Sequence, residues 1–142
     1  IDRRPYAFAK KIKELMPKEE EDYTVKSVRL TNRDEALIDE YRELIGSIQA
    51  ASPDTVIICN SIYPVEAAYD EKDNGITNTA IDIANIWIAA VANETETVYM
   101  DPASALKGAD GSLIVGYGTG DGVHIAPAGY TEILNYLNEH QC

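Results

Sequence analysis

The run Thr55-Val56-Ile57-Ile58-Cys59 (TVIIC) decides the fold class of this sequence. It is a short, continuous series of mostly β-branched residues, which is typical of a strand buried on both faces of a parallel sheet. Ser52-Pro53-Asp54 breaks the element before it. The segment 60–75, which contains a proline, several aspartates and an Asn-Gly pair, predicts a long loop after the strand. Long loops at strand ends often carry function.

Helical periodicity lies on both sides of this strand. A helix is predicted from about 35 to 51, with Asn32 placed to cap it. A second helix, capped by Thr77 or Asn78, is predicted to run to about 93. The residues expected to face the core are Leu37, Ile38, Tyr41, Leu44, Ile45 and Ile48 in the first helix, and Ile81, Ala84, Asn85, Ile88, Val91 and Ala92 in the second.

Four further elements complete an α/β pattern. A helix is predicted over 5–16, a strand over 23–30, a short strand over 97–100 and a last helix over 127–139. In the last helix we expect four inward side chains: Tyr130, Ile133, Leu134 and Leu137. Helices that alternate with strands in this order predict a parallel sheet with right-handed connections. Ligands of such sheets bind beyond the carboxyl ends of the strands.

Length and composition narrow the function classes. The chain has 142 residues, which corresponds to one domain spanning 1–142. A formal charge of −12 argues against nucleic acid or an anionic membrane as the main partner. The longest apolar stretch, 83–92, is too short for a membrane span. Two cysteines cannot make a disulfide framework or a zinc site of the usual spacing, so no metal is expected.

Charge is distributed unevenly along the chain. Residues 1–33 carry nine of the twelve basic side chains, whereas 34–142 carry three basic and eighteen acidic ones. Two interpretations stay open: a Lys-rich amphipathic helix comes first, or the two segments belong to different layers of a larger parent. Ile1 stands first and no signal-peptide pattern follows it, so we expect a processed, trimmed or partial chain.

His124 is the best candidate for acid–base chemistry. It stands three residues after Asp121, in Asp-Gly-Val-His, directly before the helix that Pro127 starts. Imidazole changes charge near neutral pH, so it suits a base that takes a proton from a hydroxyl and later returns it. A carboxylate one turn away can accept a hydrogen bond from the other ring nitrogen and set the tautomer. A surface histidine beside an Asp-Gly turn is the alternative interpretation of the same spacing.

The run Asp121 to Tyr130 (DGVHIAPAGY), followed by an amphipathic helix, resembles the last sequence block of the SGNH (GDSL) hydrolase family. The upstream segments 41–45, 52–55 and 61–65 (YRELI, SPDT and SIYPV) resemble the family's helix, strand entry and proline-bearing loop in the same order. The resemblance extends from about 34 to the C-terminus. It implies a three-layer α/β/α, flavodoxin-like parallel sheet, incomplete in this chain, and a Ser-His-Asp triad in which Asp121 orients His124.

The departures from the family concern the nucleophile and the oxyanion hole. The family's Gly-Asp-Ser block is absent, and no Gly-x-Ser-x-Gly elbow replaces it. The Gly-x-Asn-Asp block is matched only by Leu30-Thr31-Asn32-Arg33, so Asn32 is either a weak oxyanion candidate or a helix cap. Residues 1–33 align either with the helix and strand that lead into that block or with those that follow the nucleophile block.

Two functional hypotheses follow. By the first, the parent is an ester hydrolase that cleaves acyl or acetyl esters without a cofactor, its serine lies outside this chain, and the chain alone is inactive. By the second, the chain is a noncatalytic α/β binding or interaction module. A sheet that lacks its middle strand is expected to dock the missing segment, bind a second copy or swap into a dimer. Substrate identity stays open, and both a bacterial secreted and a cytoplasmic location fit the composition.

Overall fold

The computed structural model describes residues 32–141, which fall into two compact units. The first unit contains the described residues up to Cys59 together with Ile86–Tyr99. The second contains Asn60–Asn85 and the described residues from Met100 onward. The predicted helix over 5–16 and the predicted strand over 23–30 lie outside the described residues.

The first unit is built around helix α3 (Asn32–Ala51). It begins earlier than predicted, so Asn32 is the first helical residue. Ile45 is buried in a core with Cys59, Val91 and Ala92, and Ile38 and Tyr41 pack against this core. Leu37 and Leu44 are exposed, so the prediction that they face the core was wrong. The apolar stripe of α3 is therefore narrower than its sequence pattern indicates.

Strands β1 (Ile58–Asn60) and β2 (Val98–Met100) pair in a two-stranded parallel sheet. The Val98 amide donates to the Ile57 carbonyl at 3.0 Å, and the Ser61 amide donates to the Met100 carbonyl at 3.0 Å. This alternating pattern is that of a parallel ladder. The strands predicted at 55–59 and 97–100 are found as β1 and β2, although β1 begins later than predicted, and the α/β class is confirmed with them.

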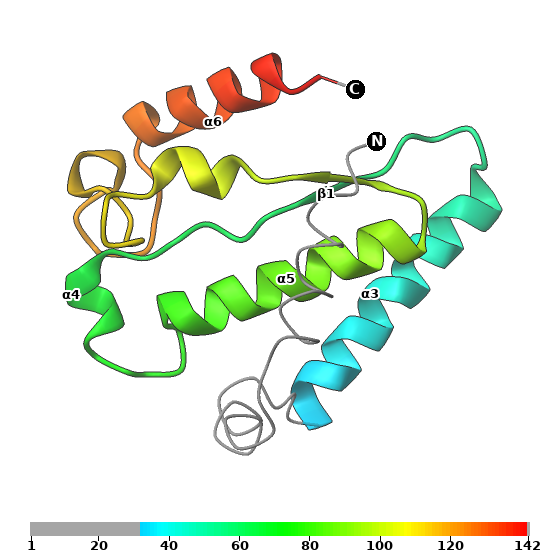
Figure 1. Cartoon of the computed structure of the whole chain (residues 1–142), viewed down its shortest axis with the longest axis horizontal. Coiled ribbons are helices and arrows are strands. Elements are labelled where there is room, and N and C mark those ends of the chain that lie inside the picture. The colour runs from blue at the N-terminus through cyan, green and yellow to red at the C-terminus, as the bar shows by residue number, and fades with distance from the viewer. Residues whose placement is uncertain (1–31, 142) are drawn as a thin grey trace. The chain divides into compact units, whose positions relative to one another are not determined.

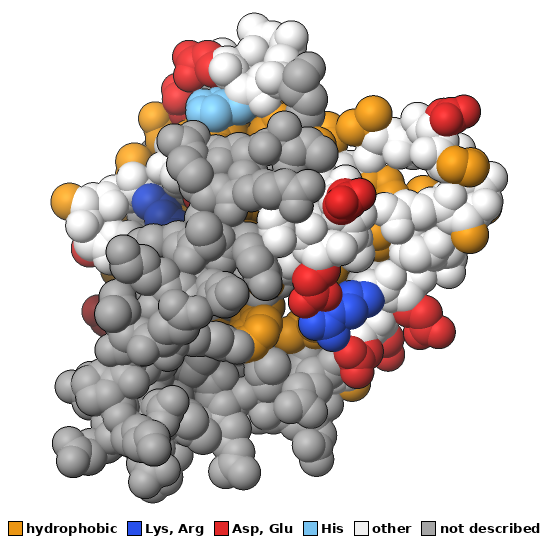
Figure 2. Space-filling view, turned by 45° about the vertical axis from the view of Figure 1, so that its right-hand side comes forward, with side chains coloured by type: hydrophobic (Ala, Val, Ile, Leu, Met, Phe, Trp, Pro, Cys, Tyr) orange, Lys and Arg blue, Asp and Glu red, His pale blue; other side chains and the backbone are white. Residues whose placement is uncertain are grey.

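The prediction that the TVIIC run is buried on both faces was wrong. Cys59 is buried, whereas Ile58 is 51% exposed and Val56 is 69% exposed. Side chains alternate between the two faces of a strand, so Cys59 faces the core and its neighbours point the other way. Figure 2 shows apolar side chains at the surface beside acidic ones on one face of the molecule. Among the described residues, therefore, only one face of this apolar run is packed against a core.

Helix α5 (Asn78–Glu94) follows the predicted boundaries closely. The Thr77 hydroxyl accepts a hydrogen bond from the Ala80 amide at 3.1 Å, so Thr77 caps the helix. At its other end Glu94 forms an ion pair with Arg42 of α3, at 2.8 Å. None of the helices among residues 32–141 is long and apolar enough to cross a membrane.

The second unit contains a short helix α4 (Ala67–Asp70) inside the predicted loop, two 3-10 turns and helix α6 (Pro127–Glu139). The 3-10 turns are η1 (Pro102–Leu106) and η2 (Val115–Tyr117). Helix α6 has the predicted boundaries and packs beside η1 and η2 (Figure 1). Ile133 is buried with Leu106 and Leu113, and Leu137 packs against this core. Tyr130 and Leu134 are exposed, which corrects the prediction that they point inward.

Candidate active site

Asp121 and His124 lie in one loop and are hydrogen bonded to each other. The contact joins the Nδ1 atom of the imidazole to the Oδ2 atom of the carboxylate. The other carboxylate oxygen accepts hydrogen bonds from the Val123 amide at 2.9 Å and from the His124 amide at 2.8 Å. The carboxylate thus holds both the backbone and the ring of the histidine. The pairing expected from the sequence spacing is present.

The same hydrogen bonds stabilise the charged form of Asp121. The amide of His124, then the amide of Val123, then the imidazole hold the pKa of this carboxyl well below its usual range. A lowered folded-state pKa contributes stability above the unfolded value, about 3.9, and this contribution is lost as the pH falls through the folded-state pKa. Asp121 is therefore ionised throughout the range in which an imidazole works as a base.

Backbone contacts close the loop into a small hairpin. Gly118 and Ile125 form an antiparallel bridge. The Thr119 amide donates to the His124 carbonyl at 3.0 Å, and the Ala126 amide donates to the Tyr117 carbonyl at 2.8 Å. These backbone hydrogen bonds fix the two ends of the loop that carries His124, directly before the first turn of α6.

Two glycines of the motif are required by close approach. At Gly129 a Cβ atom would lie 2.5 Å from the Ile125 side chain and 2.7 Å from the Tyr117 carbonyl oxygen. At Gly122, where φ is +90°, it would lie 2.8 Å from the Cβ of Tyr69. All three distances are too short for a Cβ atom, and the positive φ of Gly122 is itself unfavourable for other residues. Within the second unit, Gly122 therefore lets the loop pack against Tyr69, and Gly129 lets α6 pack against Tyr117 and Ile125.

Two asparagines of α5 position the loop that follows β1. The Asn85 side chain accepts from the Ile62 amide at 2.7 Å and donates to the Ile62 carbonyl at 3.0 Å. The Asn78 side chain does the same to Val65, at 2.9 and 3.0 Å. The sequence pattern did not predict this role, although a polar residue at position 85 within an apolar stripe is a signal of it. Buried amides are retained where they satisfy backbone groups.

The imidazole itself faces solvent in the described structure. Its side chain is 77% exposed. Among residues 32–141 no serine is hydrogen bonded to it. Ser61 is buried and its hydroxyl accepts from the Ala103 amide at 3.1 Å, which makes it a structural residue. The described residues thus contain the hydrogen-bonded Asp121–His124 pair, and its imidazole is open to solvent.

Asn32 is the other predicted site residue. It is the first residue of α3, and its side chain lies outside the described part of the structure. Its assignment to an oxyanion hole stays a prediction.

Asp101 follows β2 and is half-buried. Burial raises the pKa of this carboxyl, against the opposing effect of a hydrogen bond from Ser61. Its carbonyl accepts from the Ser104 hydroxyl at 2.7 Å, as expected of an Asp-Pro turn. Among residues 32–141 no cluster of histidine, cysteine and carboxylate side chains is placed to hold a metal ion.

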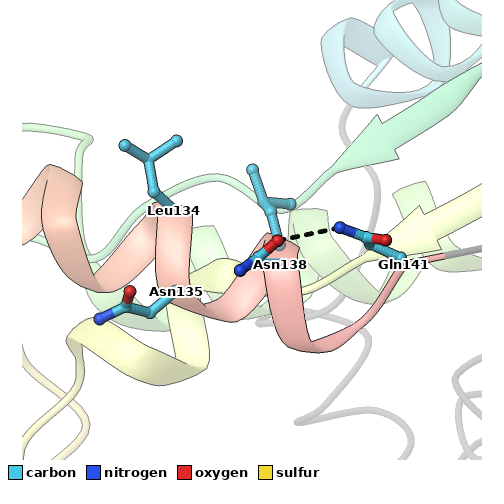
Figure 3. Close-up of a pocket in the computed structure, with 5 residues that line it drawn as sticks. Leu134, Asn135, Asn138 and Gln141 are labelled. Atoms are coloured by element: carbon cyan, nitrogen blue, oxygen red, sulfur yellow. Dashed lines mark hydrogen bonds between the residues drawn. The ribbon is translucent and has the colours of Figure 1, made fainter.

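An open hollow of about 390 Å³ lies on the surface of α6. Figure 3 shows its amide side chains, among them Asn138, which accepts a hydrogen bond from Gln141 at 2.9 Å. Leu134 and Leu137 supply the apolar part of its wall. Neither member of the Asp121–His124 pair lines this hollow.

Comparison with known proteins identifies the family. The model of the GDSL-like Lipase/Acylhydrolase family matches residues 18–131. Among curated proteins no sequence matches this chain significantly. A solved structure described as "a putative platelet activating factor from Streptococcus pneumonia" is similar, with a TM-score of 0.67 and 24% identity. The alignment covers 74% of this chain and 50% of the other, so this chain spans about half the length of that neighbour. The chain belongs to the GDSL-like lipase/acylhydrolase family.

Proposed function

We propose that this chain is the acid–base half of an ester hydrolase that works by a Ser-His-Asp mechanism. The observation that carries the proposal is the Asp121–His124 pair, in which one carboxylate binds both the backbone and the imidazole of the histidine. Family membership supports ester cleavage as the reaction class. The nucleophilic serine is supplied by sequence outside these 142 residues, and the substrate is a small acyl or acetyl ester.

In this mechanism His124 takes up and gives back a proton twice, once as the acyl-serine forms and once as it is hydrolysed. As the serine attacks the ester carbonyl, His124 takes the hydroxyl proton and becomes imidazolium, which the ionised Asp121 stabilises. The proton then goes to the departing alkoxide, so an alcohol leaves and an acyl-serine remains. A water molecule then gives a proton to His124 as its oxygen attacks the acyl carbonyl, and the bond to the serine oxygen breaks. His124 returns the proton to that oxygen, which releases the carboxylic acid and the free serine. Asn32 is proposed as one donor to the oxyanion.

The test uses the intact parent protein and a small activated ester such as p-nitrophenyl acetate. We expect His124→Ala to lower turnover by roughly 10⁴-fold, because the proton acceptor is lost. His140→Ala is the matched control, since the only other histidine of the sequence stacks on Tyr136 at the end of α6. Normal turnover in His124→Ala would refute the assignment.

A noncatalytic binding module is the second candidate. It is favoured by the high exposure of the His124 side chain and by the lack of a hydrogen-bonded serine among residues 32–141. A fluorophosphonate probe separates the candidates, because it labels an activated serine. Labelling of the intact parent supports the hydrolase. A parent gene without an in-frame Gly-Asp-Ser, upstream of Ile1 or between Val28 and Asn32, together with no labelling, supports the module.

A further inference from the structure

Glu66 has a buried side-chain oxygen that no described hydrogen bond stabilises. The residue is only 9% exposed, and its buried Oε1 atom has no hydrogen-bond partner among residues 32–141. Burial of a polar oxygen without a hydrogen-bond partner costs free energy, so packing, and not a polar contact, holds this side chain in place. Glu66 is the residue before α4, at the end of the loop that Asn78 and Asn85 hold.

Glu66 contacts the hairpin that carries His124 (residues 118–125, called the His124 hairpin) at two points. Its amide donates to the carbonyl of Gly122, at the tip of the hairpin, at 2.9 Å. Its carboxylate lies against Gly118, at the base: a Cβ atom on Gly118 would lie 2.8 Å from Oε1. Gly118 is also the residue that bridges to Ile125. One residue thus spans the hairpin from base to tip.

We propose that Glu66 is a positioning residue for the Asp121–His124 pair, acting through the length of its side chain. The inference rests on the proposed function of that pair. The side chain fills the space beneath Gly118, which keeps the hairpin base in place while the Glu66 amide fixes the tip. The charge of Glu66 does not position the pair, because Asp121 is stabilised by hydrogen bonds from Val123 and His124 and not by Glu66.

Two matched substitutions separate length from charge. Glu66→Gln keeps the length and removes the charge, whereas Glu66→Asp keeps the charge and shortens the side chain by one methylene. The readout is the fraction of His124 in the Nδ1–H tautomer, measured by ¹⁵N NMR of the 142-residue chain at a pH where the ring is neutral. His140, the second histidine, is the internal reference. This signature reports the Asp121 hydrogen bond directly and does not require catalysis.

We expect Glu66→Gln to keep the wild-type tautomer fraction and to fold at least as stably, because a neutral amide costs less to bury than a carboxylate. We expect Glu66→Asp to lower the Nδ1–H fraction at least about twofold, since the hairpin base loses its support. A loss in Glu66→Gln, or a wild-type fraction in Glu66→Asp, would overturn the proposal.

A double-mutant cycle gives a second test that does not depend on Glu66→Asp folding. Gly118→Ala places a Cβ in the space that Oε1 occupies, so it alone should lower the tautomer fraction. Glu66→Ala combined with Gly118→Ala should recover part of it, because the space is refilled. Strict additivity in the cycle would count against the proposal. If the intact wild-type parent does not hydrolyse p-nitrophenyl acetate although His124 is in the Nδ1–H tautomer, the proposed function is refuted and this inference stands.

Discussion

The His124 hairpin and the strand β1 differ in where their packing partners come from. Gly118–Ile125 is closed by its own backbone and by Glu66, and its glycines allow contacts that no other residue would permit. The β1 region is packed on one face and leaves Val56 and Ile58 exposed. Backbone contacts within its own turn help to close the hairpin, whereas the burial of the β1 region depends only on what lies against it. Substitutions should therefore act differently in the two.

The largest effect is expected in the core that supports the hairpin. Leu106 is fully buried against Leu113 and Ile133. Leu106→Ala should lower the free energy of unfolding by about 2–5 kcal/mol, measured by urea denaturation, because it leaves a cavity. The matched control is Leu134→Ala on the exposed face of α6, with an expected change within about 0.5 kcal/mol. Equal losses would show that the outer face of α6 is covered in solution.

Glycine substitutions compare the two units directly. Gly129→Ala should cost about 1–3 kcal/mol, because its Cβ would overlap the Ile125 side chain and the Tyr117 carbonyl. Gly46 lies in α3 with nothing near its missing Cβ, so Gly46→Ala should stabilise the chain by up to about 1 kcal/mol. Thermal unfolding of both variants checks the opposite signs. A neutral Gly129→Ala would disprove the close approach of α6 to the hairpin.

In the first unit, substitutions at an exposed and at a buried apolar position can be compared. Ile58→Thr on the exposed face of β1 should change the free energy of unfolding by less than about 0.5 kcal/mol. Val91→Thr should cost about 1–3 kcal/mol, because it buries a hydroxyl in the core with Cys59 and Ile45. Chemical denaturation gives both values. A large loss in Ile58→Thr would mean that a partner covers this face in solution.

The smallest effect concerns alkaline pH. Burial, followed by the interaction with Cys59, raises the pKa of Tyr41 to about 12. Since this value exceeds the unfolded one, the stability that Tyr41 contributes is complete below about pH 10 and is lost as the pH rises toward 12. Tyr41→Phe should flatten this dependence in urea titrations near pH 9 and near pH 11. Tyr130→Phe, at an exposed position of α6, should leave it unchanged.

Much of the fold could be predicted from local signals. Thr77 and Pro127 mark helix starts by chemistry that acts within one turn, and α5 and α6 have the predicted boundaries. The Asp121–His124 contact also follows from spacing, because three residues are enough for an aspartate to reach the amides and the ring that follow it.

The prediction of burial was less successful. Leu37, Leu44, Ile58 and Leu134 were expected to be inside because their spacing fits an apolar face, yet all four are exposed. An apolar pattern shows which face could be buried and not what packs against it. Glu66 illustrates the converse case, since no sequence pattern predicts a buried carboxylate against a glycine.

Within residues 32–141, the sequence by itself determined the order of α3, β1, α5, β2 and α6 and the spacing that lets Asp121 bind His124 before the last helix. These depend on interactions between residues a few positions apart, which spacing and turn chemistry specify. Only the tertiary structure decided which apolar faces are packed, why Gly122 and Gly129 cannot carry a side chain, and that Glu66 lies against the His124 hairpin. Those outcomes depend on contacts between segments far apart in the chain, and no local pattern contains them.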